Sequence, residues 1–130
     1  MANSTFTGVI RSGKDKDGQV GVVMLVAEIA FDPTQTSALT GFVFPAGSVI
    51  TGITSLGGAT GGTAPTVDIG TTAGGVEIAN ELDADTAGTA GTLGAAGWVK
   101  MTVDTPVYAG VGASAATGGT TTIAITYYRT

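Results

Sequence analysis

Acidic side chains are the residues of this 130-residue sequence with the most evident chemistry. Glu77, Glu81, Asp83 and Asp85 lie close together in the chain. Carboxylate oxygens are the ligands that hard cations such as Ca²⁺ prefer, so this cluster could hold such an ion. A solvated acidic loop accounts for the same cluster without a ligand, and it is the interpretation that we favour.

A second acidic motif, Asp15-Lys16-Asp17-Gly18, resembles the start of a calcium-binding EF-hand loop. The glycine comes too early for that loop, and Val26 occupies the position of the bidentate acid. An Asp-Gly pair between apolar stretches is also a typical hairpin turn. We therefore predict a charged, solvated turn here and no metal-binding residue anywhere in the chain.

Histidine and cysteine are absent from the sequence. Their absence excludes a Ser-His-Asp triad, a thiol nucleophile and a zinc site with nitrogen or sulfur ligands. A glycosidase needs only two carboxylates but commonly has an aromatic-lined groove. Aromatic residues make up only 6% of this chain. The pairs Gly57-Gly58 and Gly61-Gly62 lack the sequence context of a phosphate-binding loop. We predict that the protein is not an enzyme, with no catalytic residue and no cofactor.

The net charge of −5 has the wrong sign for binding nucleic acid or an anionic membrane surface. The longest apolar run, Val20 to Ala27, is far shorter than the roughly 20 residues of a membrane span. The first residues also lack the basic and apolar regions of a signal peptide. We expect a soluble protein that is made in the cytoplasm and has neither nucleic acid nor membrane as a partner.

Small residues dominate the composition, since Gly, Ala, Thr and Ser make up 70 of the 130 residues. Apolar positions recur with the two-residue period of β-strands, and Gly, Asp, Pro and Thr interrupt them at short intervals. This pattern predicts one all-β domain over residues 1–130, an antiparallel β-sandwich with long Gly/Thr/Ala-rich loops. A jelly roll is the commonest plan of this size, although an immunoglobulin-like or irregular Greek key would give the same pattern.

The predicted strands follow the apolar alternation between turn signals. They are Thr5 to Arg11, Gln19 to Phe31, Leu39 to Phe44, Ser48 to Leu56, Ala64 to Gly70, Gly75 to Leu82, Trp98 to Asp104, Thr105 to Gly112 and Thr120 to Tyr128. In the strand from Trp98 to Asp104, the alternation predicts that Val99, Met101 and Val103 face the core. The stretch from Thr86 to Gly97 is predicted to be a long surface loop.

The strand from Gln19 to Phe31 is apolar on both faces over most of its length. One face can enter the core of the domain, and the other needs a second cover. We therefore predict that Val22, Met24 and Val26 lie in a subunit interface; cover by another part of the same chain is the alternative. Association would also supplement the modest burial that so many small residues allow.

Two aromatic residues, Trp98 and Tyr128, are candidates for an exposed aromatic contact. Aromatic residues in strands commonly contribute to the core or to an interface, whereas exposed ones can stack against a sugar ring. Their neighbours in the sequence do not separate these two roles.

Five segments in this order resemble the tailed-bacteriophage capsid decoration proteins, which are also called cement or head-stabilising proteins. The segments are FPAGSVITGI (Phe44 to Ile53), APTVDIGT (Ala64 to Thr71), GGVEIANELDA (Gly74 to Ala84), TPVYAGVGA (Thr105 to Ala113) and TTIAITYYR (Thr121 to Arg129). The shared pattern consists of turns and strands and contains no catalytic signature.

The resemblance implies a small, often jelly-roll-like sandwich that binds the major capsid protein and stabilises the outer shell of the virion, commonly as a homotrimer. Synthesis would occur in the host cytoplasm before assembly. The resemblance transfers no individual functional residue to this chain. Two alternatives remain: a carbohydrate-binding head-fibre or host-adhesion module, and a tail or baseplate structural protein.

Overall fold

The computed structural model describes residues 23–130, which form strands and no helix. The all-β prediction and the antiparallel sandwich are therefore confirmed. The strands are β1 (Leu25–Phe31), β2 (Ala38–Phe44), β3 (Ser48–Ser55), β4 (Ala59–Thr60), β5 (Thr66–Gly70), β6 (Ala79–Asp83), β7 (Thr89–Ala90), β8 (Thr105–Val111), β9 (Gly118–Gly119) and β10 (Thr121–Arg129). Within the described residues, no helix is long and apolar enough to cross a membrane.

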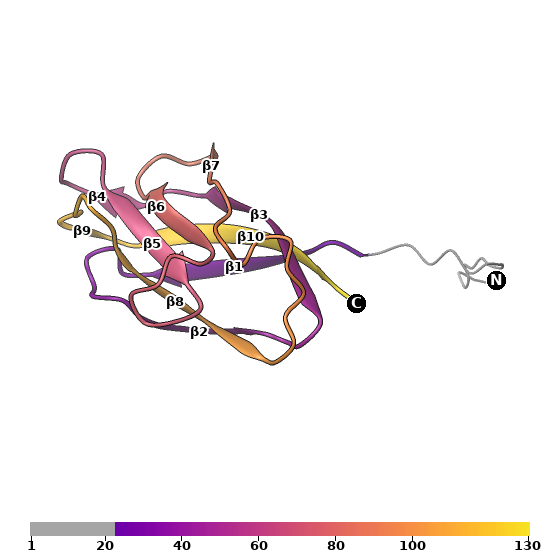
Figure 1. Ribbon diagram of the computed structural model, residues 1–130. Helices are drawn as coiled ribbons and strands as arrows, with labels where there is room; N and C mark the ends of the chain where they lie inside the picture. Colours follow the sequence, from indigo (N-terminus) through magenta and orange to yellow (C-terminus); the bar gives the residue numbers. More distant parts are fainter. Residues whose placement is uncertain (1–22) are drawn as a thin grey trace, which may run out of the picture.

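Two four-stranded sheets form the sandwich, with the strand orders β1-β10-β3-β7 and β2-β8-β5-β6. Figure 1 shows the two sheets stacked and the short β4-β9 ribbon at one end. The edge strands β1 and β2 share one side of the sandwich, and β3, β7 and β6 approach one another on the other. We call these the open side and the second side.

The core lies between the sheets and is built by the two-residue alternation that the sequence shows. In β10, Ile123 and Ile125 are fully buried, and they pair with Ile29 and Ala27 of β1. Such a strand buries one face and leaves the other for polar residues. The buried apolar side chains are Ala27, Ile29, Phe31, Phe44, Val49, Ile50, Ile53, Ala59, Val67, Ile69, Ile78, Ala79, Leu82, Ala84, Met101, Val107, Ala109, Ala116, Ile123 and Ile125.

Three aromatic rings join the two sheets at one end of the core. The ring of Phe44 on β2 lies 4.9 Å from the ring of Phe42 and 4.9 Å from that of Tyr127 on β10. Both pairs meet edge to face, at 81° and 82°. This is a favoured arrangement of aromatic quadrupoles. The cluster fixes the end of β2 against the end of β10.

The stretch from Thr86 to Gly97 lies at the surface, as predicted, since none of its residues is buried. It also contains the two-residue strand β7 and covers two sheet edges. Its residues donate backbone hydrogen bonds to β3, from Gly88 to Ser55 (2.8 Å) and from Gly91 to Ile53 (2.9 Å). They also bond the chain next to β6, where Gly94 donates to Ile78 over 2.9 Å. We call residues 86–104 the closing segment, because they close the second side of the sandwich.

The predicted strand from Trp98 to Asp104 is wrong. Trp98 has a left-handed backbone (φ +61°), which breaks the strand alternation, and this part of the closing segment touches β3 only at separate points. Met101 is buried as predicted, whereas Val99 and Val103 are 55% and 66% exposed. The alternating apolar residues of this stretch therefore do not all point toward the core.

The predicted strand from Gly75 to Leu82 begins later, because β6 starts at Ala79. The carboxylate of Glu77 accepts hydrogen bonds from the Thr71 N–H (2.8 Å) and the Thr72 hydroxyl (2.9 Å), and so closes a turn before the strand. The predicted strand from Thr5 to Arg11 and the turn at Lys14 to Gly18 lie outside the described residues.

A candidate docking surface at one end of the sandwich

Large apolar side chains are exposed mainly at one end of the sandwich. Eight of the eleven large apolar side chains that are exposed in the described residues belong to the start of β1, the end of β2 and the closing segment. We call these eight the apolar end: Val23, Met24, Leu25, Val26, Val43, Trp98, Val99 and Val103. Because contiguous exposed apolar patches are uncommon on monomeric proteins, this concentration indicates a binding surface.

Strand register brings these distant segments together. Leu25 at the start of β1 pairs with Tyr127, and the next residue of β10, Tyr128, pairs with Val49 at the start of β3. Val49 in turn forms a bridge with Lys100 of the closing segment. Neighbouring strands lie about 4.8 Å apart, so β1 and the closing segment are about 15 Å apart across this end.

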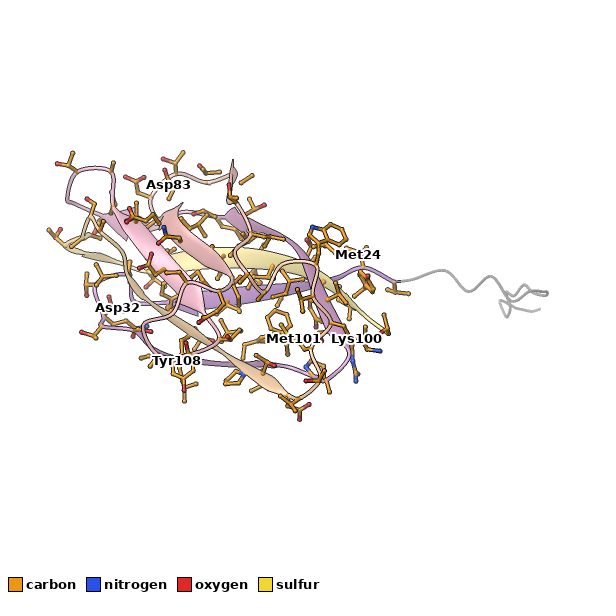
Figure 2. All side chains as sticks on the ribbon, viewed as in Figure 1. Met24, Asp32, Asp83, Lys100, Met101 and Tyr108 are labelled. Atoms are coloured by element: carbon orange, nitrogen blue, oxygen red, sulfur yellow. The ribbon has the colours of Figure 1, made fainter. Side chains whose placement is uncertain are left out.

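The end of β2 joins the same surface through the corner between β2 and β3. The N–H of Ala46 in this corner donates to the Asp104 carboxylate over 2.9 Å, and the N–H of Gly47 donates to the Met101 carbonyl over 2.8 Å. The Met101 N–H completes the contact by donating to Ser48 over 2.9 Å. These bonds hold the closing segment beside the end of β2. Figure 2 shows Met24, Lys100 and Met101 gathered at this end.

Trp98 is the largest side chain of the apolar end, and 67% of its surface is exposed. Its N–H donates to the Ile50 carbonyl over 2.9 Å, which fixes the residue to the edge of β3. A left-handed backbone is rare for a bulky residue and costs about 1–3 kcal/mol. Such strain is characteristic of functional positions, and here it accompanies an indole that is directed into solvent.

A shallow groove of about 240 Å³ lies along the closing segment. The groove is lined by Thr71, Ala96, Val99, Lys100, Met101, Thr102, Val103 and Thr105. Most of these residues belong to the closing segment, and the groove could receive an apolar side chain of a partner. None of the lining side chains is a carboxylate.

Charges are distributed unequally between the two ends. Within residues 23–130 the basic side chains are those of Lys100 and Arg129, which both lie at the apolar end. The acids Asp32 and Asp83 lie at the opposite end, near the turns that follow β1 and β6. Asp104 also lies at the apolar end, but its carboxylate accepts a hydrogen bond from the corner after β2. A partner of the apolar end therefore meets mainly apolar and basic groups.

The structure does not gather the acidic cluster that the sequence suggested as a cation site. Asp83 accepts hydrogen bonds from the N–H groups of Asp85 (3.0 Å) and Thr86 (2.7 Å), so it caps a turn. Burial acts to raise the pKa of Glu77, but the hydrogen bonds from Thr71 and Thr72 outweigh it and hold that pKa below its usual value. In residues 23–130, no three acidic side chains converge as a metal site requires. The Asp15-Asp17 motif lies outside these residues.

The predicted contact residues lie in different environments. Met24 and Val26 are 52% and 62% exposed, Trp98 is exposed, and Tyr128 is partly buried. Val22 lies outside the described residues. The assignment of Val22, Met24 and Val26 to a subunit interface, and of Trp98 and Tyr128 to an aromatic contact, remains a prediction.

Sequence reasoning missed Val43, Val99 and Val103 as surface residues. The outward position of Val43 could have been found, because it alternates with the inward Phe42 and Phe44 in β2. No sequence pattern indicates that Val99 and Val103 are exposed, since their alternation with Met101 predicts that they are buried. Their exposure follows from the irregular path of the closing segment along β3.

The fold is similar to that of a solved chain from the cyanophage Pam1 capsid asymmetric unit. The TM-score is 0.61 at 19% sequence identity, and the match covers 95% of this chain and 98% of the Pam1 chain. The two chains therefore share an architecture over nearly their whole lengths. No protein-family model and no curated protein matches the sequence.

Proposed function

We propose that this chain is a non-catalytic structural protein of a phage capsid, which decorates and cements the outer shell. The observation that carries this proposal is the fold shared with a chain of the Pam1 capsid over nearly the full length of both chains. The segment order in the sequence, which resembles capsid decoration proteins, supports the same function independently.

The strand order supports the jelly-roll part of this proposal. With the short β4 and β9 set aside, eight strands form two sheets in the orders β1-β10-β3-β7 and β2-β8-β5-β6. Successive strands change sheet at every connection except the hairpin from β5 to β6 and thus form interlocked antiparallel Greek keys. Eight strands in two such keys define a jelly roll, the architecture of many capsid and lectin domains.

The apolar end supports docking on the major capsid protein. A cement protein must bury surface against the shell, and stable interfaces bury about 800 Å² on each partner, with aromatic residues prominent at their centres. The exposed Trp98 and the exposed valines of the apolar end supply apolar surface of this kind, and the acidic opposite end would face solvent.

The proposed assembly is a homotrimer in which Val22, Met24 and Val26 contribute to the subunit interface. The exposure of Met24 and Val26 supports this role, because both are apolar and available for burial. Light scattering of the purified chain tests the proposed trimer. A mass of three chains of 12.7 kDa each would support it, and a monomer both in solution and on the shell would contradict it.

A binding assay with capsid shells tests the proposed function. Shells of the phage that encodes this chain, assembled without it, should bind the purified protein and gain resistance to heat. The variant Val103→Asp with Trp98→Ala should bind at least about tenfold more weakly, because it removes two exposed apolar contacts of the apolar end and leaves the proposed subunit interface unchanged. Leu39→Asp is the matched control, since Leu39 is 60% exposed on β2 but lies outside the apolar end. Shells that bind no protein, or that show unchanged heat resistance when saturated, would refute the cement function.

One observation favours a second candidate, a carbohydrate-binding head-fibre or host-adhesion module. The strained and exposed Trp98 could stack against a sugar ring. A glycan array with the purified protein distinguishes the two functions, because a hit that Trp98→Ala abolishes supports adhesion. Electron microscopy of labelled virions would reveal the remaining alternative, a tail or baseplate protein, by the position of the label.

A further inference from the structure

Strand β1 presents a regular backbone edge on the open side of the sandwich. It pairs with β10 residue by residue, from Leu25 with Tyr127 to Phe31 with Thr121, without a bulge. The direction of these bonds follows from Thr122 in β10. Its carbonyl accepts from the Leu56 N–H over 2.8 Å and its N–H donates to Gly57 over 3.1 Å, so both groups point away from β1.

Backbone groups alternate in direction along an antiparallel strand, so the neighbours of Thr122 in β10 point toward β1. Their partners in β1 are the odd-numbered residues from Leu25 to Phe31. The N–H and C=O groups of Val26, Glu28 and Ala30 consequently point to the free edge. Within residues 23–130 these groups have no strand partner.

The other long edges are protected. The closing segment covers the edge of β3, where Trp98 and Met101 donate to Ile50 and Ser48, and it also covers the chain beside β6. The pairing of β2 with β8 is interrupted between Leu39 and Val43, around a glycine with φ +91°. Proteins commonly use covers and bulges of this kind to prevent unwanted pairing at sheet edges. The regular edge of β1 has neither device in the described residues.

We propose that residues Thr5–Arg11 of the same chain add to this edge as an antiparallel strand. Twenty-two residues precede the described part, whose first residue, Val23, comes two residues before β1. Thr5–Arg11 has the alternation of a strand, with Phe6, Gly8 and Ile10 on one face. The Asp17-Gly18 pair between this segment and β1 is a typical hairpin turn.

The register of a hairpin is consistent with this arrangement. We assume a regular hairpin whose turn has two to four residues and ends at Asp17 or Gly18. The residue paired with Val26 then lies within residues 5–9. When that partner is Thr5, Thr7 or Val9, Phe6 and Ile10 lie on the same face as the buried Ala27 and Ile29.

The added strand has a consequence for binding, although it does not depend on the proposed function. Pairing would remove the backbone edge of β1 from contact with other proteins. Partners on this side would then be recognised by the side chains of the apolar end, and not by addition of a strand from the partner.

Amide hydrogen exchange of the full chain, followed residue by residue by NMR, tests the proposal. The amides of Val26 and Glu28 report on the free edge, and those of Ala27 and Ile29, which face β10, are internal controls for folding. In the unaltered chain we expect Val26 to exchange at least about tenfold more slowly than an unprotected amide, since exchange then requires the strand to open.

Two variants with the same change in charge test whether Thr5–Arg11 is the segment that pairs with the edge of β1. Phe6→Lys with Ile10→Lys disrupts the face that packs on the core and should remove the protection of Val26. Thr5→Lys with Thr7→Lys changes the opposite face of the same segment and should retain it. Ala27 and Ile29 should stay protected in both variants.

Three results would overturn the proposal. Unprotected exchange of Val26 in the unaltered chain would show that the edge is bare. Equal protection in the two variants would show that the edge is occupied by something other than Thr5–Arg11. Protection of Val26 that falls on dilution, while that of Ala27 persists, would instead assign the edge to a second copy of the chain.

Discussion

The two sides of this sandwich manage their sheet edges differently. On the second side, the closing segment follows β3 and β6 and satisfies backbone groups of both sheets. On the open side, β1 and β2 lie next to each other without such a cover in the described residues. The second side is therefore closed by tertiary contacts within the domain, whereas the open side is available to other segments or chains.

An irregular segment can thus protect a sheet edge as well as a strand can. The closing segment contains only the two-residue β7, yet its amides reach carbonyls along β3 from Ser55 to Ser48. Because the path is irregular, some of its apolar side chains enter the core and others reach solvent. The same segment thus closes one side and supplies a large part of the apolar end.

The largest expected effect concerns the anchor of the closing segment. Met101 is buried, so Met101→Ala leaves a cavity where a side chain packs. It should reduce the free energy of unfolding by about 2–5 kcal/mol. Val103, two residues away, is exposed. Val103→Ala should change the same free energy by only about 0.5 kcal/mol or less. Urea unfolding measures both values. Equal losses in the two variants would show that Met101 does not anchor the segment.

A smaller effect is expected where the closing segment passes close to the chain before β6. A Cβ atom on Gly94 would lie 2.6 Å from the carbonyl oxygen of Val76 and 2.7 Å from that of Glu77. Gly94→Ala should therefore cost about 1–3 kcal/mol of stability, as overpacking commonly does. Ala95→Ser changes an exposed neighbour and serves as the control. A neutral Gly94→Ala would indicate that the closing segment can move away from β6 without loss.

The strain at Trp98 gives an effect of opposite sign. The backbone of Trp98 has a positive φ, which glycine adopts without steric cost. Trp98→Gly should therefore raise the free energy of unfolding by up to about 1 kcal/mol. Trp98→Ala removes the same indole but keeps the strained backbone, so it should bring no gain. Thermal unfolding distinguishes the two variants. If both variants are equally stable, the left-handed conformation is not strained in the folded protein.

The smallest expected effect depends on pH at the turn before β6. The pKa of Glu77 is held below its ordinary value of 4.5. Its ionised form therefore stabilises the fold at neutral pH. This contribution is present above pH 4.5 and is lost as the pH falls through the lowered pKa. Glu77→Gln should flatten the pH dependence of the melting temperature below pH 4.5. An unchanged slope in this variant would show that other carboxylates dominate acid unfolding.

Several elements could be predicted from sequence because local alternation and turn chemistry determine them. The apolar positions of β10 predict its inward face, and Pro45-Ala46-Gly47 marks the corner between β2 and β3. In such segments one face must be buried, and the two-residue period identifies it. The same reasoning failed for Val99 and Val103, because it assumes a regular strand.

Composition and local periodicity are enough to predict the all-β fold, the absence of histidine and cysteine, and the apolar residues before and at the start of β1. They do not predict that β1, the end of β2 and the closing segment meet at one end, because strand register and hydrogen bonds between distant residues place them there. A surface of this kind consists of side chains brought together by long-range pairing, which no local pattern encodes.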